Sequence, residues 1–130
     1  MLFRSHVAEL GETVGEALLR PHRSYLHVLS PALERGWIKG MAHITGGGIT
    51  ENLPRVLPPD RSFSLDRQSW DIPPVFRWLQ RAGHVEDAEM MRAFNMGVGL
   101  IVVCAPERAD DLLGLLRGSG EPAWAIGHVV

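Results

Sequence analysis

Three consecutive glycines, Gly46–Gly48, follow an apolar segment and precede a short helix-like run, and they restrict the local fold more than any other part of the sequence. Because glycine has no Cβ, the chain can adopt positive φ there and turn sharply from a strand into a helix. The same backbone lets several N–H groups converge on one anion, with the dipole of a following helix adding to the attraction. The glycines alone leave two interpretations open: a phosphate-binding loop, or a tight turn without a ligand.

Hydrophobic periodicity predicts helices alternating with strands along the chain. The predicted helices cover 12–19, 25–33, a short run containing Leu53 and Val56 with Thr50 or a loop residue as its cap, 74–83, 86–94 and 106–118. The predicted strands cover 37–45, 61–66, 99–105 and 124–130. This order predicts a mixture of helices and sheet, but periodicity by itself does not separate a parallel sheet from an α+β arrangement.

Composition predicts one ordinary globular domain over residues 1–130. The chain is 45% hydrophobic and 22% charged with a net charge of −2, close to globular averages. Its arginines are scattered among acidic residues, which argues against nucleic-acid binding. The longest apolar run, Val98–Ala105, is too short to cross a bilayer and no secretory signal is recognisable, so we expect no membrane association and a cytoplasmic location.

Several kinds of active site lack their sequence pattern here. There is no Gly-x-x-x-x-Gly-Lys-Ser/Thr loop for ATP and no Gly-x-Ser-x-Gly elbow for a serine hydrolase. No two histidines lie at helical i,i+4 spacing and His84-Val85-Glu86 is too sparse for a ligand set, so we predict no metal site. Cys104, the single cysteine, is predicted to be a buried thiol because it lies within the apolar run.

A longer window is more specific than the glycines. The run His43-Ile-Thr-Gly-Gly-Gly-Ile-Thr-Glu-Asn-Leu-Pro-Arg55 resembles a signature of the phosphoribosylformylglycinamidine cyclo-ligase family, also called aminoimidazole ribonucleotide synthetase. Further similar blocks follow the family's order: Val14–Leu19, Pro21, Tyr25, Ser69–Trp70, Pro73, Val75–Gly83 and Glu89–Gly99. One departure is His22, which stands where the family usually has threonine.

The resemblance covers about residues 14–130 and only the C-terminal domain of the family's enzyme. It implies an α+β fold in which a mixed β-sheet with partial ferredoxin-like topology is flanked by helices. It also implies that the N-terminal domain, which carries most of the ATP- and metal-binding machinery in this family, has no counterpart in this sequence.

The resemblance also implies an activity for the full enzyme. Enzymes of this family use ATP and Mg²⁺ to close the imidazole ring of formylglycinamidine ribonucleotide, giving aminoimidazole ribonucleotide. The expected partners are that substrate, the missing N-terminal domain and a second copy in a homodimer. ATP and Mg²⁺ are expected to bind the full-length enzyme and not to bind tightly to this chain alone. We therefore expect the isolated chain to lack turnover.

The candidate site residues surround the glycines. His43 is the candidate catalytic residue, for substrate orientation or proton transfer, and the candidate substrate- and phosphate-binding residues are Thr45, Gly46, Gly47, Gly48, Asn52, Arg55 and Asn95. Each also has a structural explanation: a hydrogen-bonded strand histidine for His43, a solvated helix face for Asn52 and Arg55, and a closed turn for Asn95.

Two functions remain open from the sequence. The first is the substrate-binding part of the cyclo-ligase, and the second is a non-catalytic module that binds a phosphorylated metabolite or docks on a separate N-terminal partner. Related ATP-using synthetases carry a His-Asp-x-Ser/Thr-x-Gly-Gly pattern, whereas here Ile44 follows His43, which favours the cyclo-ligase.

Overall fold

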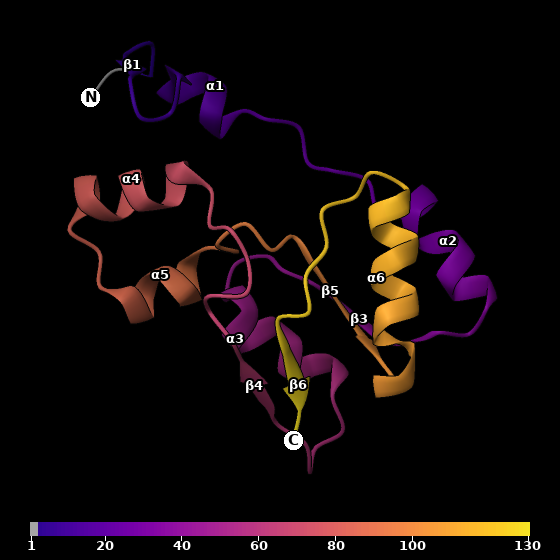
Figure 1. Ribbon diagram of the computed structural model, residues 1–130. Helices are drawn as coiled ribbons and strands as arrows, with labels where there is room; N and C mark the ends of the chain where they lie inside the picture. Colours follow the sequence, from indigo (N-terminus) through magenta and orange to yellow (C-terminus); the bar gives the residue numbers. More distant parts are fainter. Residues whose placement is uncertain (1–2) are drawn as a thin grey trace.

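Helices alternate with short strands throughout residues 3–130, the part of the chain that the computed structural model describes (Figure 1). The elements in chain order are β1 (His6–Val7), β2 (Glu12–Thr13), α1 (Val14–Leu18), α2 (Leu26–Glu34), β3 (Ile38–His43), α3 (Gly48–Asn52), the 3₁₀ helix η1 (Leu53–Val56), β4 (Phe63–Leu65), α4 (Pro74–Gly83), α5 (Asp87–Ala93), β5 (Leu100–Cys104), the 3₁₀ helix η2 (Pro106–Arg108), α6 (Ala109–Gly118) and β6 (Gly127–Val129). The predicted α+β class is confirmed.

The strands pair in three separate two-stranded antiparallel sheets, β1–β2, β3–β5 and β4–β6. The resemblance to the family predicted a single mixed sheet, and this prediction is wrong for residues 3–130. β4 and β6, with three residues each, hydrogen-bond only to one another. Phe63, Leu65 and Ile126 pack their side chains against the core beside β3–β5, so side-chain packing, and not a continuous ladder, joins the two sheets.

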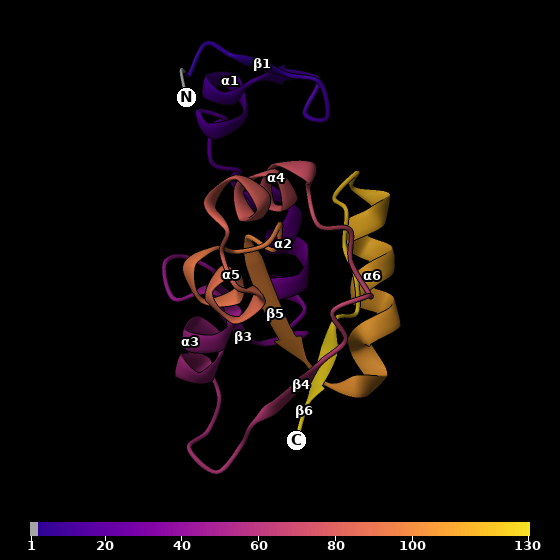
Figure 2. The same cartoon turned by 90° about the vertical axis from the view of Figure 1, so that its left-hand side faces the viewer.

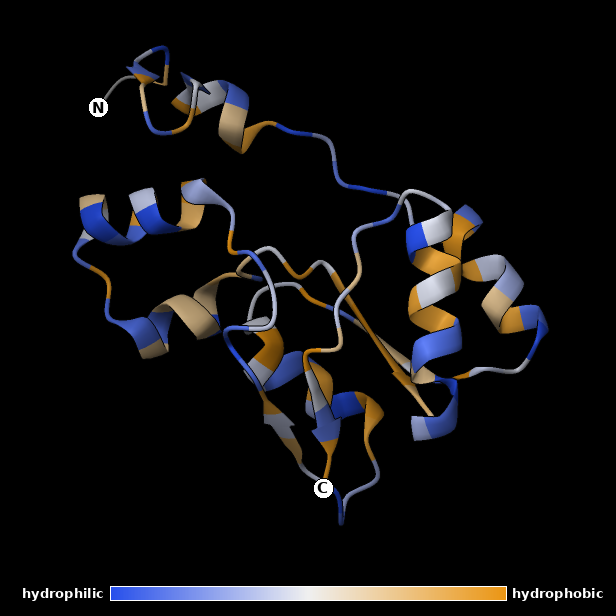
Figure 3. Cartoon of the chain, in the orientation of Figure 1, coloured by the Kyte–Doolittle hydropathy of each residue, from blue (hydrophilic) through white to orange (hydrophobic). Residues whose placement is uncertain are grey.

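The β3–β5 ladder separates two hydrophobic cores. Alternate residues of a strand point to opposite faces, and β5 is apolar on both, as its orange colour in Figure 3 shows. Leu100, Val102 and Cys104 pack on one face against α2 and α6. Ile101 and Val103 face the larger core, whose fully buried centre is Ile49 and Met90. Helices thus cover both faces of the ladder, and the segment after β3 enters the larger core.

Helix and strand positions follow the sequence predictions closely, with two differences. Thr50 or a loop residue was the predicted cap: Thr50 lies inside α3, and the loop residue Gly47, whose backbone is left-handed, is the N-cap. The β1–β2 hairpin was not predicted, because two-residue strands leave no periodic pattern, and the predicted helix over 12–19 is wrong at Glu12 and Thr13, which form β2. Cys104 is half-buried beside α6, and burial together with Glu107 raises the pKa of its thiol.

The hairpin and α1 form an N-terminal unit that lies apart from the rest, joined to α2 by an extended segment (Figures 1 and 2). A capping box at Thr13 and Glu16 begins α1. An ion pair between Glu9 and Arg81 ties this unit to α4. Leu19, in the extended segment, is 82% exposed. Among the described residues, no helix has the length and apolar character needed to span a bilayer.

Candidate functional site

The three glycines form the turn between β3 and α3. Gly48 N–H donates to the Thr45 carbonyl at 2.9 Å, and Ile44 N–H donates to the Gly99 carbonyl at 3.0 Å, which fixes the loop to the start of β5. Gly47 and Gly48 both have positive φ, +102° and +60°, which L-residues with a side chain rarely adopt. Thr45 and Gly46 are exposed, so one side of the loop faces solvent.

Asn52 holds the loop in shape from inside the protein. Its side chain is buried, and its Nδ2 donates to the Gly48 carbonyl at 2.8 Å and to the Thr45 and Gly46 carbonyls at 3.3 Å each. Its Oδ1 accepts from Arg55 Nη1 at 3.3 Å and from the Thr45 hydroxyl at 3.5 Å. The structure thus brings four of the predicted site residues together around one amide, which lies behind the loop and away from its open side.

Arg55 and Asn95 occupy different environments. Arg55 is exposed on η1 and uses one guanidinium nitrogen to bond Asn52, so its other N–H groups face solvent. Asn95 accepts from Gly97 N–H at 2.9 Å through Oδ1 and closes the turn before β5. Its neighbour Phe94 places a carbonyl against the glycine loop, but no side-chain hydrogen bond joins Asn95 to that loop among residues 3–130.

His43, the last residue of β3, is exposed and contacts a second histidine from the extended segment. His43 Nε2 lies 2.9 Å from His22 Nε2, and the two rings meet edge-on with centroids 4.8 Å apart. His22 Nδ1 lies 2.9 Å from the Arg23 carbonyl. The structure therefore places His22 next to His43. In the sequence, His22 was notable only because it differs from the threonine usual in the family.

Two residues that follow His22 in the chain, Arg23 and Tyr25, anchor its segment to the body of the protein. Arg23 forms an ion pair with Glu121 at 2.5 Å, although the contact does not have hydrogen-bond geometry. The ring of Tyr25 lies edge-on to His22 at 6.3 Å between centroids. Its hydroxyl packs against Gly99, where a Cβ would come within 2.1 Å of it. The segment is thus held directly after His22.

We expect Tyr25 to ionise only above its ordinary pKa of 10.0, because burial, and secondly the Glu121 carboxylate, raise that pKa. Its contribution to stability is present below the unfolded pKa and is lost as pH rises through the higher folded pKa. Tyr25 is the only tyrosine, so an ultraviolet absorbance titration reports on it alone. The midpoint should lie above 10.0 in the folded chain and fall in denaturant; equal midpoints would contradict the burial of this hydroxyl.

Comparison with known proteins gives a consistent result. The family described as "AIR synthase related protein, C-terminal domain" matches residues 1–130. The chain belongs to this family. A phosphoribosylformylglycinamidine cyclo-ligase from Desulfitobacterium hafniense (strain DSM 10664 / DCB-2) is 46% identical over 128 residues, which cover 98% of this chain and 38% of that protein.

Two further relatives carry the same name. The protein from Neisseria meningitidis serogroup C (strain 053442) is 51% identical over 119 residues, 92% of this chain and 35% of its own length. The protein from Chromobacterium violaceum is 50% identical over 118 residues, 91% of this chain and 34% of its own length. The chain therefore spans little more than a third of the curated relatives it matches.

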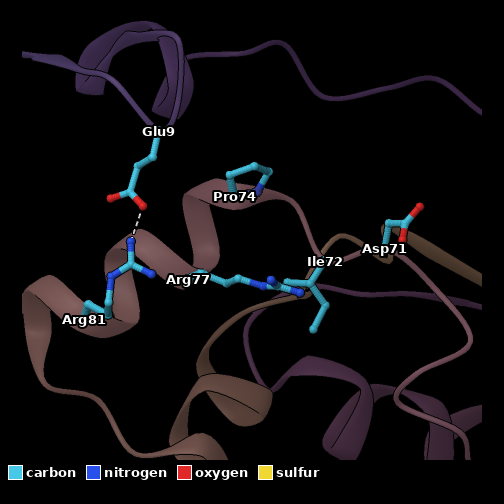
Figure 4. Close-up of a pocket in the computed structure, with 6 residues that line it drawn as sticks. All are labelled: Glu9, Asp71, Ile72, Pro74, Arg77 and Arg81. Carbon is cyan, nitrogen blue, oxygen red and sulfur yellow. Dashed lines mark hydrogen bonds and ion pairs between the residues drawn. The ribbon is translucent and has the colours of Figure 1, made fainter.

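Two cavities in this member of the AIR synthase C-terminal family lie away from the glycine loop. The larger, about 300 Å³, separates the N-terminal unit from α4 and is lined by Glu9, Asp71, Ile72, Pro74, Arg77 and Arg81 (Figure 4). Arg81 pairs with Glu9 across it, while Arg77 extends toward Ile72. The smaller, about 190 Å³, shares Ile72 and Arg77 with it and reaches the core methionines beside α5. The exposed candidate residues, His43, Thr45, Gly46 and Arg55, line neither cavity.

No group of three or more His, Cys, Asp or Glu side chains within residues 3–130 is arranged to hold a metal ion. The exposed residues with polar groups around the loop are Thr45, Gly46 and Arg55, with the His22–His43 pair at the end of β3. Such groups can bind an anion and move a proton.

Proposed function

We propose that this chain is the C-terminal, substrate-binding part of an ATP-dependent cyclo-ligase that closes the imidazole ring of formylglycinamidine ribonucleotide in purine biosynthesis. One observation carries the proposal: relatives named phosphoribosylformylglycinamidine cyclo-ligase match 91–98% of the chain at 46–51% identity. The open side of the glycine loop supports it, because Thr45 and Gly46 are exposed while Asn52 fixes their carbonyls from behind.

In this proposal the loop and Arg55 hold the phosphate of the substrate. A rigid loop loses little conformational entropy on binding, and the guanidinium of Arg55 offers free N–H donors that suit phosphate oxygens. Gly46 presents its backbone without a side chain in the way. Asn52 and Asn95 support the site indirectly, since each hydrogen-bonds backbone atoms of its own turn.

The reaction proposed for the full enzyme consists of an activation by ATP, a ring closure and the loss of phosphate. Phosphorylation by ATP activates the formyl oxygen of the substrate, the amidine-side nitrogen forms a bond to the formyl carbon, and phosphate leaves with the electron pair of the C–O bond. The attacking nitrogen must lose a proton, and His43 is the titratable group of this chain proposed to receive it. We assign ATP and Mg²⁺ to the enzyme as a whole, acting in the cytoplasm together with an N-terminal domain and as a homodimer.

The second candidate is a non-catalytic module that docks on a separate N-terminal partner. Exposed apolar side chains near the start of the chain favour it: Phe3 is 70% exposed, Leu19 82% and Leu26 65%. Large apolar side chains left exposed on a surface are candidates for contact with another protein. Mixing the chain with an N-terminal partner would then restore turnover that the chain alone lacks.

Titration of the chain with formylglycinamidine ribonucleotide, with and without Mg-ATP, tests the proposal by calorimetry and product analysis in the same samples. We expect saturable binding of the ribonucleotide without product, because the substrate phosphate site lies in this chain and the ATP machinery does not. Absence of binding at millimolar ribonucleotide would contradict a substrate site in the chain.

The variant Gly46→Val examines the loop without disturbing its fold. A Cβ at Gly46 meets nothing within 4 Å, whereas one at Gly47 would come within 2.8 Å of Glu51 at positive φ, so Gly47→Val would mix strain with ligand effects. We expect Gly46→Val to weaken ribonucleotide binding by roughly tenfold or more, about 1.4 kcal/mol, since the branched side chain would cover the open side of the loop. Gly114→Val on α6, also unobstructed, is the matched control and should bind normally.

A further inference from the structure

The hydrogen bonds of His22 determine which of its ring nitrogens carries the proton. Nδ1 lies 2.9 Å from the Arg23 carbonyl, and a carbonyl oxygen only accepts, so Nδ1 is the donor. In the neutral ring Nε2 then holds a lone pair. We assign these protons from the hydrogen-bond partners.

The assignment extends from His22 to His43. The two Nε2 atoms are 2.9 Å apart, and a hydrogen bond at this distance needs one donor and one acceptor. Because His22 Nε2 is the acceptor, His43 Nε2 carries the proton. The lone pair of neutral His43 therefore lies on Nδ1, which has no hydrogen-bond partner among residues 3–130.

His22 is held firmly enough to impose this order. The ion pair of Arg23 with Glu121 fixes the residue that accepts from Nδ1, and Tyr25 contacts the His22 ring edge-on. Tyr25 is itself seated on Gly99, whose carbonyl accepts from Ile44 N–H beside His43. The segment that carries His22 and the residue that follows His43, Ile44, are thus both held at Gly99, directly before β5.

We propose that His22 is a positioning residue that sets the tautomer of His43, directing a basic Nδ1 toward substrate. The proposal rests on the proposed function, in which His43 receives the proton that the attacking nitrogen loses. With Nε2 already occupied as a donor to His22, Nδ1 is the nitrogen left to accept. A histidine pair of this kind makes one ring a base of defined orientation and uses the other as its support.

Long-range ¹H–¹⁵N spectra of the full 130-residue chain, labelled with ¹⁵N-histidine, test the assignment without any substrate. The spectra are recorded at alkaline pH. We expect His22 to be protonated at Nδ1 and His43 at Nε2, with a ¹⁵N–¹⁵N coupling between the two Nε2 atoms across the hydrogen bond. Protonation of His43 at Nδ1, or of His22 at Nε2, would overturn the proposal.

The variant His22→Ala removes the acceptor and identifies its effect on His43. We expect the coupling to vanish and a signal of the Nδ1-protonated form of His43 to appear, because neither nitrogen is then bonded to a partner. His27→Ala, on the exposed side of α2, is the matched control and should leave both tautomers unchanged. A His43 spectrum that His22→Ala does not alter would sink the proposal.

Ribonucleotide binding separates this proposal from the one on which it rests. Binding with the wrong tautomers contradicts the role of His22 alone. The expected tautomers without ribonucleotide binding contradict the substrate site, while the structural assignment stands.

Discussion

Gly48→Ala is expected to destabilise the fold by about 3–5 kcal/mol, near the upper end for a single substitution. An alanine Cβ at this position would lie 1.9 Å from the Met91 carbonyl oxygen and 3.0 Å from that of Phe94. Both atoms belong to the backbone around the end of α5, so no side-chain rotation relieves the contact. The residue also has φ of +60°, which adds about 1–2 kcal/mol for an L-residue with a side chain.

Urea unfolding monitored by tryptophan fluorescence measures this effect. Gly46→Ala is the matched control in the same loop, because a Cβ there meets nothing within 4 Å and φ is not positive. We expect the control to unfold within about 0.5 kcal/mol of the parent chain. Equal stability of the two variants would show that α5 does not approach the loop as closely as the structure has it.

Asn52→Asp is expected to be the second most damaging change, costing about 3 kcal/mol, and to be worse than Asn52→Ala. The buried Nδ2 donates to the carbonyls of Thr45, Gly46 and Gly48. A carboxylate oxygen in its place would face carbonyl oxygens without a proton between them, in a site shielded from water. Alanine only leaves these carbonyls without their donor, which costs about 1–3 kcal/mol.

The comparison of the two Asn52 variants at neutral and acidic pH checks this reason. Protonation gives the aspartic acid a hydroxyl that can donate to a carbonyl, so Asn52→Asp should recover part of its stability at low pH relative to Asn52→Ala. A constant difference between the two variants would mean that carbonyl repulsion is not the cause. Thermal unfolding across a pH series provides both numbers.

Local features of the sequence predicted the elements that carry the site. The strand over 37–45, the break at the glycines and the buried strand over 99–105 all correspond to elements of the structure, β3, the 44–48 loop and β5. Such features are encoded by neighbouring residues: an apolar run, a missing Cβ, a proline at a helix start. The β1–β2 hairpin has no such local pattern, because each of its strands has only two residues.

The glycine loop shows where local reasoning stops. The sequence suggested a phosphate-binding loop or a tight turn. The structure shows which of the three glycines are needed for folding and gives a separate reason for each of the two that are. Gly48 is required by the close approach of α5, and Gly47 by its left-handed backbone before α3. Gly46 alone has neither constraint, which makes it the position at which ligand binding can be tested apart from folding.

The sequence by itself determined the order of elements, because periodicity and glycine positions are properties of adjacent residues. Its motif blocks identified the family, and that resemblance supplied the α+β class. Only the tertiary structure decided that Asn52 faces inward to hold the loop and that His22 meets His43 across 21 positions of the chain. Those contacts depend on how separate segments pack against β5 and the two cores. A one-dimensional pattern does not specify which distant side chains this packing brings within hydrogen-bond reach.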